Sequence, residues 1–157
     1  MKILVISDTH GNVNGAFAAH TRSEPVDAIV HLGDGSSDAD ILREALDIPV
    51  ISVAGNCDPG STSPRECVWE CEGKKLLLTH GDAYQVKSGL VRLQQRVLEL
   101  GIDGALFGHT HQRICEKFSG ILLINPGTLA AYGMSRSYAV LSITLEEGLT
   151  CRHFDLE

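Results

Sequence analysis

Residues 2–11 read KILVISDTHG, an apolar run that passes directly into a polar loop. The apolar part, residues 2–6, is typical of a buried β-strand, and the polar residues end it. Asp8 and His10 are two residues apart, so in extended backbone their side chains point to the same side. A carboxylate next to an imidazole is a partial metal site. The other ligands of such a site would have to come from elsewhere in the chain.

The same arrangement recurs along the first third of the chain. Apolar segments at residues 28–32 and 50–53 are each expected to form a strand that ends in a polar loop with glycine. Between the strands we expect two helices, one at residues 16–21 and one that begins at a capping box of Ser37 and Asp40. Alternating strands and helices predict a parallel sheet, with ligand chemistry at the C-terminal ends of its strands.

The rest of the chain is predicted to be mainly β-structure. A helix is expected at residues 88–100, and a tight turn at residues 125–127. The further strands are expected at residues 67–71, 75–79, 104–107, 113–118, 121–124, 138–144 and 149–154. These are too many for one simple parallel sheet, so a second sheet packed on the first is expected.

Length and composition narrow the class of protein. The 157 residues suit a single domain, residues 1–157, of ordinary globular composition. The net charge of −7 disfavours nucleic acid as a partner, because binding the phosphate backbone needs clustered Lys and Arg. An anionic substrate is still compatible, since bound divalent cations would reverse the local field.

Cysteine content and hydropathy bear on the cellular location. There are five cysteines, an odd number, and the strand begins directly after Met1 with no pattern of a signal peptide. No apolar run has the roughly 18 residues needed to cross a bilayer. The sequence therefore predicts a cytoplasmic protein with reduced thiols and no membrane contact.

Polar residues beside glycine follow five of the expected strands. The potential metal ligands among them are Asp8, His10, Asp34, Asn56, His80, His109 and His111. This mixture of nitrogen and oxygen donors suits Mn, Fe, Zn or Co better than Ca, and the lack of cysteine in it argues against a soft thiolate site. Seven ligands are too many for one ion with an open position. They suit two ions, about 3.5–4 Å apart, that share a bridging carboxylate.

Each of these motifs also has an ordinary structural explanation. The segment Asp8-Thr9-His10 could be a helix cap with a surface histidine, and Gly33-Asp34 and Gly55-Asn56 could be simple turns. Two histidines one residue apart, as in His109-Thr110-His111, are uncommon away from metals. Because all these motifs coincide with strand ends, the metal site is the favoured interpretation.

Five motifs, in this order, resemble the calcineurin-like metallophosphoesterase superfamily, and most closely its small bacterial and archaeal YfcE-like phosphodiesterase branch. The motifs are Asp8-Thr9-His10, Gly33-Asp34, Gly55-Asn56-Cys57-Asp58, Thr79-His80-Gly81-Asp82 and Gly108-His109-Thr110-His111. A sixth segment, Asn125-Pro126-Gly127-Thr128, is similar to the Asn-Pro-Gly-Ser turn of the family.

The resemblance implies a four-layer α/β/β/α sandwich of two mixed β-sheets flanked by helices, with two divalent metal ions at the strand ends. It implies one metal site made of Asp8, His10 and His111 and a second made of Asn56, His80 and His109. Asp34 is implied as the bridge between the ions. A hydroxide that bridges the two ions would attack phosphorus in line. Mn is the favoured metal, and Ni, Fe, Co or Zn would also accept these ligands.

Cys57 is the departure from the wider superfamily, in which many members have histidine after the Gly-Asn pair. That histidine is thought to protonate the leaving oxygen or to hold the phosphate. A thiol with a pKa near 8.5 is a poor substitute for imidazolium. We therefore expect Cys57 to lie near the substrate and to give weak help to the leaving group. A covalent role for Cys57 is disfavoured, because the metal-bridging hydroxide already serves as nucleophile.

The expected function is that of a metal-dependent phosphoesterase, most simply a phosphodiesterase, that hydrolyses a small phosphate ester. The alternative is a non-catalytic protein-interaction scaffold of the same fold, as in the retromer-subunit branch of the superfamily. The complete set of seven ligands favours the hydrolase, because a decayed site should have lost some of them. A metal-dependent nuclease is disfavoured by the absence of a basic run.

Overall fold

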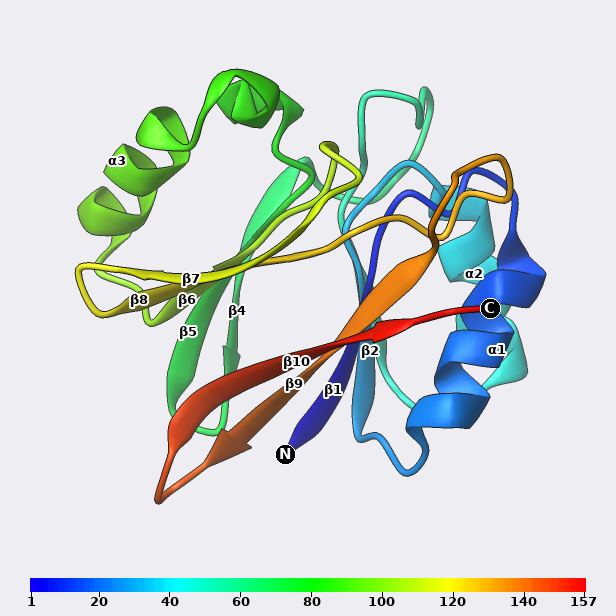
Figure 1. Cartoon of the computed structure of the whole chain (residues 1–157), viewed down its shortest axis with the longest axis horizontal. Helices are drawn as coiled ribbons and strands as arrows, with labels where there is room; N and C mark the ends of the chain where they lie inside the picture. The colour runs from blue at the N-terminus through cyan, green and yellow to red at the C-terminus, as the bar shows by residue number, and fades with distance from the viewer.

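The computed structural model describes all 157 residues, which form two five-stranded sheets and three α-helices (Figure 1). Sheet A contains, in spatial order, β10 (Gly148–Asp155), β9 (Ser137–Thr144), β1 (Lys2–Ile6), β2 (Ala28–His31) and β3 (Val50–Ser52). Sheet B contains β4 (Glu66–Cys71), β5 (Lys74–Thr79), β6 (Gly104–Leu106), β8 (Ile121–Pro126) and β7 (Arg113–Phe118). Both sheets are mixed. In sheet B the parallel strands β5, β6 and β8 are flanked by antiparallel β4 and β7. In sheet A the parallel strands β1, β2 and β3 reach one edge, and antiparallel pairing of β9 with β1 and with β10 completes the other side.

The helices are α1 (Val13–Ser23), α2 (Ser36–Ala45) and α3 (Val91–Leu100). Figure 1 shows α1 and α2 beside sheet A and α3 on the far side of sheet B. Two short 3₁₀ turns, η1 (Asp82–Tyr84) and η2 (Val86–Ser88), precede α3. None of the three α-helices is both long enough and apolar enough to span a membrane.

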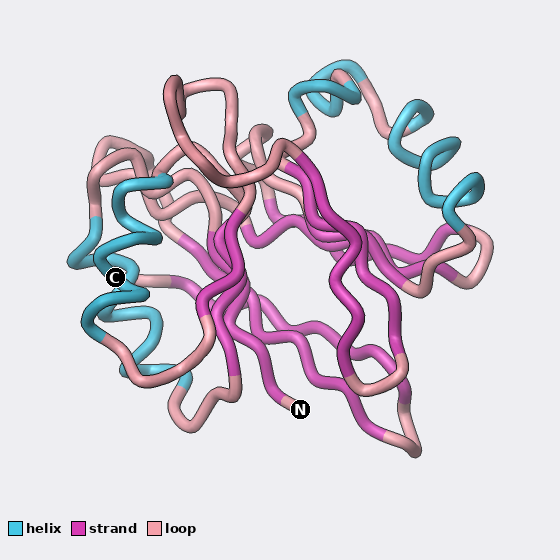
Figure 2. Tube along the Cα trace, turned by 180° about the vertical axis from the view of Figure 1, so that it is seen from behind, coloured by secondary structure: helices cyan, strands magenta, loops and turns pink.

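Three apolar cores hold the layers together. Ile3 of β1 and Leu78 of β5 belong to the core between the two sheets, while their neighbours Leu4 and Leu77 belong to the cores under the helices. Side chains alternate between the faces of a strand, so a strand that is buried on both faces has a continuous apolar sequence. The two sheets therefore lie face to face with helices outside (Figure 2), and the expected four-layer α/β/β/α sandwich is confirmed.

The predicted capping box of α2 is wrong. The helix begins at Ser36, its N-cap residue is Gly35, and no side chain of its own first turn caps it. The carboxylate of Asp58 accepts hydrogen bonds from the N–H groups of Gly35 and Ser36 instead. The cap thus comes from the loop after β3, more than twenty residues away in sequence.

Two further boundaries differ from expectation. The helix expected from residue 88 begins at Val91, because Gly89 has a φ of +130° that interrupts the helical path after η2. Of the turn expected at residues 125–127, only Gly127 lies outside a strand, because Asn125 and Pro126 pair with β7 as the end of β8. Pro126 lies beyond the stretch of β8 that pairs with β6, so its missing N–H costs no hydrogen bond there.

Replacing Leu78 with alanine tests the core between the sheets. Leu78 is fully buried there, and we expect Leu78→Ala to lower the free energy of unfolding by about 2–5 kcal/mol. Urea unfolding followed by circular dichroism would measure this change. Val68 on β4 is 46% exposed, so Val68→Ala should cost less than about 1 kcal/mol. Equal losses in the two variants would contradict the assigned core.

Candidate metal centre

The potential ligands gather where the parallel strands of both sheets end. Asp8 and His10 follow β1, Asp34 follows β2, and Asn56 follows β3, all in sheet A. From sheet B, His80 follows β5, and His109 and His111 follow β6. Six of the seven are linked by contacts of 3.1–3.9 Å between side-chain nitrogen and oxygen atoms or between two nitrogens. Asn56 is the exception.

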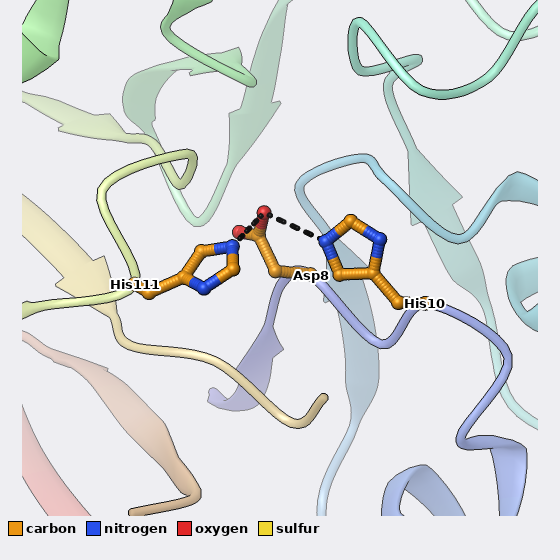
Figure 3. A group of neighbouring side chains, drawn as sticks. All are labelled: Asp8, His10 and His111. Atoms are coloured by element: carbon orange, nitrogen blue, oxygen red, sulfur yellow. Dashed lines mark hydrogen bonds and ion pairs between the residues drawn. The ribbon is translucent and has the colours of Figure 1, made fainter. Parts of the chain in front are cut away.

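One group of donors contains Asp8, His10 and His111 (Figure 3). Oδ1 of Asp8 lies 3.1 Å from Nε2 of His111 and 3.6 Å from Nε2 of His10. Figure 3 shows the two imidazoles on opposite sides of the carboxylate, with a nitrogen of each turned towards it. The three donor atoms lie within 4.8 Å of one another, so one cation could contact all of them.

A second group contains Asp34, His80 and His109. Nε2 of His80 lies 3.2 Å from Oδ2 of Asp34 and 3.1 Å from Nδ1 of His109. Nδ1 of His80 lies 2.7 Å from the carbonyl oxygen of Leu32, which can only accept a hydrogen bond. His80 therefore donates from Nδ1, and its Nε2 is directed at the other ligands. In the imidazolium form this nitrogen donates to Asp34, and in the neutral form it offers a lone pair to a cation.

The two groups meet at Asp34 and His10. Oδ2 of Asp34 lies 3.8 Å from Nε2 of His10, too far for a hydrogen bond. This nitrogen of His10 is buried and has no hydrogen-bond partner, although carboxylates lie on two sides of it. A buried polar atom without a partner costs free energy, which a cation between these groups would recover. The residues present therefore fit a divalent cation.

Charge supports the same interpretation. Burial raises the pKa of Asp34, but hydrogen bonds from His80 and from the backbone N–H of Cys57 outweigh it and hold the pKa below its usual range. Burial likewise raises the pKa of Asp8, and its hydrogen bond with His111 and the charge of His80 outweigh that effect. Burial, aided by His80, lowers the pKa of His109. Both carboxylates are thus ionised near neutral pH, while His109 keeps a lone pair.

Backbone strain is concentrated at the ligands. Eight non-glycine residues have a positive φ, between 46° and 71°, and five of them are Asp8, His10, Asp34, His109 and His111. Residues other than glycine rarely adopt this left-handed backbone conformation, and it persists only where the surroundings enforce it. The strained backbone positions of these loops are therefore mostly those that carry candidate ligands.

Asp58 enforces the conformation of two of these loops. Its carboxylate accepts four hydrogen bonds of 2.7–3.0 Å from the backbone N–H groups of Asp34, Gly35, Ser36 and Gly55. It thereby joins the loop after β2 to the loop after β3. Sequence reasoning did not assign this role, and the only local signal is an acidic residue three positions after Gly55, a common turn pattern.

Buried polar residues hold the loop after β1 in the same way. Asp38 on α2 accepts hydrogen bonds from the hydroxyl of Thr9 and from the N–H of Gly11. The hydroxyl of Thr128 donates to the carbonyl oxygen of Asp8. His31, expected to be a core histidine or a partner of a ligand, is fully buried and contacts Thr9 rather than a ligand.

Asn56 and Cys57 lie at the rim of the cluster. Asn56 is exposed, and its amide donates to the sulfur of Cys57 at 3.5 Å without bonding any of the other six candidate ligands. The N–H of Cys57 donates to Oδ1 of Asp34 at 2.8 Å. Burial, together with the nearby charge of Asp34, raises the pKa of the Cys57 thiol, so the thiol is protonated near neutral pH.

Tyr132 is a rim residue that sequence reasoning missed. It lies in the loop before β9, is 71% exposed, and places its ring 5.7 Å from the ring of His10. Such an aromatic side chain could contact a substrate that enters the site. It follows the segment Asn125-Pro126-Gly127-Thr128 by four residues, but no local pattern distinguishes it from an ordinary exposed tyrosine.

Comparison with known families and sequences finds phosphoesterase relatives. The family model of the calcineurin-like phosphoesterase superfamily domain matches residues 1–147. A probable metallophosphoesterase of Bacillus subtilis, YsnB, is 34% identical over 157 residues, which cover 99% of this chain and 91% of YsnB. The phosphodiesterase YfcE of Escherichia coli is 27% identical, with 94% of each chain covered.

Solved structures share the fold. A predicted phosphoesterase from Streptococcus pneumoniae superimposes with a TM-score of 0.76 at 23% identity, covering 98% of this chain and 97% of the other. Vps29 from Entamoeba histolytica, in a complex with zinc, also superimposes with a TM-score of 0.76 at 23% identity, with both chains fully covered. At this identity the likeness concerns the fold alone.

Replacing Asp58 with asparagine tests its role in holding the loops. Each carboxylate oxygen of Asp58 accepts two hydrogen bonds, whereas asparagine has only one acceptor oxygen. We therefore expect Asp58→Asn to lower the free energy of unfolding of the metal-free protein by about 2 kcal/mol, measured by urea unfolding in the presence of a chelator. Metal affinity, measured by calorimetry, should fall roughly 10- to 100-fold. The control Asp40→Asn removes an exposed acid on α2 that pairs with Arg43, and should change stability by less than about 1 kcal/mol. Unchanged metal affinity in Asp58→Asn would contradict the proposed support.

Proposed function

This chain belongs to the calcineurin-like phosphoesterase superfamily, and from that premise we propose that it is a phosphodiesterase that works with two divalent metal ions. The observation that carries the proposal is the unpartnered Nε2 of His10 between the carboxylates of Asp8 and Asp34. Two ligand groups that meet at this point suit a pair of ions better than a single one. We further propose that residues 1–157 act as one metallophosphoesterase domain.

We assign the ligands to the ions as two sets that share Asp34. Asp8, His10 and His111 would hold one ion, and Asn56, His80 and His109 the other. Asn56 is the weakest assignment on geometry, but its exposed side chain has room to turn. Mn is the favoured metal, with Ni, Fe, Co and Zn also compatible with these nitrogen and oxygen donors. When bound, the ions would activate water for in-line attack on phosphorus and neutralise the phosphoryl oxygens.

The chain itself positions the reacting groups. Left-handed backbone at Asp8, Asp34 and His109 directs their side chains to one point, and the hydrogen bond from His80 to Leu32 fixes the tautomer of that ligand. Cys57 lies beside Asp34 as a protonated thiol, so it can offer only a weak hydrogen bond to a leaving oxygen. A small phosphate ester is the proposed substrate.

The alternative is a non-catalytic scaffold, which we consider because the fold resembles that of Vps29. Two observations favour the hydrolase. Every candidate ligand position holds a competent ligand, and strain is retained at five of them. A surface used only for docking would need neither ionised buried carboxylates nor strained ligands.

The first test is metal-dependent hydrolysis. After chelator treatment the protein should not hydrolyse bis-p-nitrophenyl phosphate, and Mn²⁺ should restore activity, with Ni²⁺, Co²⁺ and Zn²⁺ compared and Mg²⁺ as a hard-ion reference. Asp34→Asn should lower kcat/KM at least about 100-fold. Replacing a residue that only hydrogen-bonds to a metal ligand costs roughly 10- to 100-fold, and Asp34 is proposed to be a ligand itself. Asp47→Asn, an exposed acid before β3, is the control. A folded protein that is inactive with every metal would favour the scaffold.

The second test concerns the leaving group. Because the Cys57 thiol is a poor proton donor, we expect nitrophenyl diesters to be hydrolysed at least about 100-fold faster than alkyl diesters, the lower end of what a general acid contributes. The ratio of kcat/KM for matched nitrophenyl and alkyl esters measures this preference. Equal values for the two esters would show that a better proton donor than Cys57 operates in the site.

A further inference from the structure

A third group of donors overlaps the two described above and includes a sulfur atom. Sγ of Cys57, a carboxylate oxygen of Asp34 and a ring nitrogen of His10 lie within 4.8 Å of one another. Asp34 and His10 are the two residues at which the metal groups meet. The sulfur therefore faces the centre of the cluster, on the side of the loop after β3.

The position of Cys57 is fixed by its backbone, whereas its side chain is free to move. The N–H of Cys57 donates to Oδ1 of Asp34, which keeps the residue beside this carboxylate. The sulfur itself is exposed, is not in a disulfide, and receives one long hydrogen bond of 3.5 Å from Asn56. Rotation of one exposed side chain can thus bring sulfur closer to the cluster at little cost.

The distances are close to those of a coordinated ion. In a tetrahedral zinc site, with Zn–S near 2.3 Å and Zn–N near 2.0–2.1 Å, sulfur and nitrogen ligands are about 3.5 Å apart. The three donors need to approach one another by no more than about 1.3 Å from the observed limit of 4.8 Å. His10 has an unpartnered nitrogen already directed at this space, so no existing hydrogen bond has to break on that side.

We propose that Cys57 is a conditional metal ligand, whose sulfur joins His10 and Asp34 around a thiophilic ion such as Zn²⁺ or Cd²⁺ but not around Mn²⁺. The inference rests on the proposed metal site and extends it to the choice of metal. Thiolate sulfur prefers Zn²⁺ and Cd²⁺, whereas Mn²⁺ prefers oxygen and nitrogen donors. The same site would therefore hold Mn²⁺ through nitrogen and oxygen ligands alone and Zn²⁺ through a set that includes sulfur.

Sulfur coordination would have a functional consequence. On coordination the S–H bond of Cys57 breaks, the proton passes to solvent and the thiolate binds the ion. The bound sulfur fills a position that water or substrate needs, and it leaves the place beside the leaving group. The zinc-loaded protein should consequently turn over substrate more slowly than the manganese-loaded protein. Cys57 would in this way make the activity depend on which metal the cell supplies.

The test is a spectroscopic titration of the full-length, metal-free protein with Cd²⁺. Coordination of Cd²⁺ by thiolate produces an ultraviolet charge-transfer band that nitrogen and oxygen ligands do not produce. We expect this band in the wild-type protein below one equivalent of Cd²⁺, its loss in Cys57→Ser, and its retention in Cys115→Ser. Cys115 is the control, because it is also an exposed free thiol but lies on β7. Its hydrogen bond with Cys151 makes this pair the other place that could supply thiolate to Cd²⁺, and a band retained in Cys115→Ser excludes it.

Binding affinities supply the second measurement. Cys57→Ser should weaken Cd²⁺ and Zn²⁺ binding at least about tenfold, because losing even a hydrogen-bond partner of a ligand lowers metal affinity by that factor. The same substitution should leave Mn²⁺ affinity unchanged. A wild-type protein that binds Mn²⁺ and hydrolyses the diester but shows no band would overturn this inference alone. A band of equal strength in Cys57→Ser would also overturn it. Failure to bind either Mn²⁺ or Cd²⁺ would overturn the proposed function as well.

Discussion

The structure depends on the burial of two carboxylates, Asp8 and Asp34, where the ends of the two sheets meet. No lysine or arginine forms an ion pair with either of them, and their charged neighbours are histidines. Burying ionised carboxylates without a cation is costly, so the imidazoles and backbone N–H groups around them have to be placed closely. A divalent cation would complete this compensation. At this site the protein's own residues therefore compensate the buried charge only incompletely.

Holding that point requires support from distant residues. Left-handed backbone at the ligands is unfavourable on its own, and hydrogen bonds from other elements keep it in place. Asp58 joins the loops after β2 and β3, and Asp38 on α2 holds the loop after β1. Thr128 contacts Asp8 from the loop between β8 and β9. Rigid positioning of this kind is what a site that orients ligands or substrate needs.

Much of this could be predicted from sequence, because the strongest signals are local. β1 and β5 contain apolar runs buried on both faces, and each strand is followed within two residues by a candidate ligand. The cap of α2 could not be predicted, since Asp58 reaches it only after β2 and β3 have paired. The start of α3 depended on the unusual φ of Gly89, which residue type permits but does not specify. The orientation of Asn56 away from the other ligands was likewise set by its loop and had no sequence signal.

The ligands come from both halves of the sandwich, and this has a mechanical consequence. Asp8 and His111 touch across 103 residues of sequence, one from sheet A and the other from sheet B. An ion held by this pair is also a cross-link between two layers that are otherwise joined mainly by apolar side chains. Loading the ion would therefore add a link between the two sheets to the hydrogen bonds and apolar contacts that already join them. Occupancy of the metal site would in this way be coupled to the rigidity of the fold.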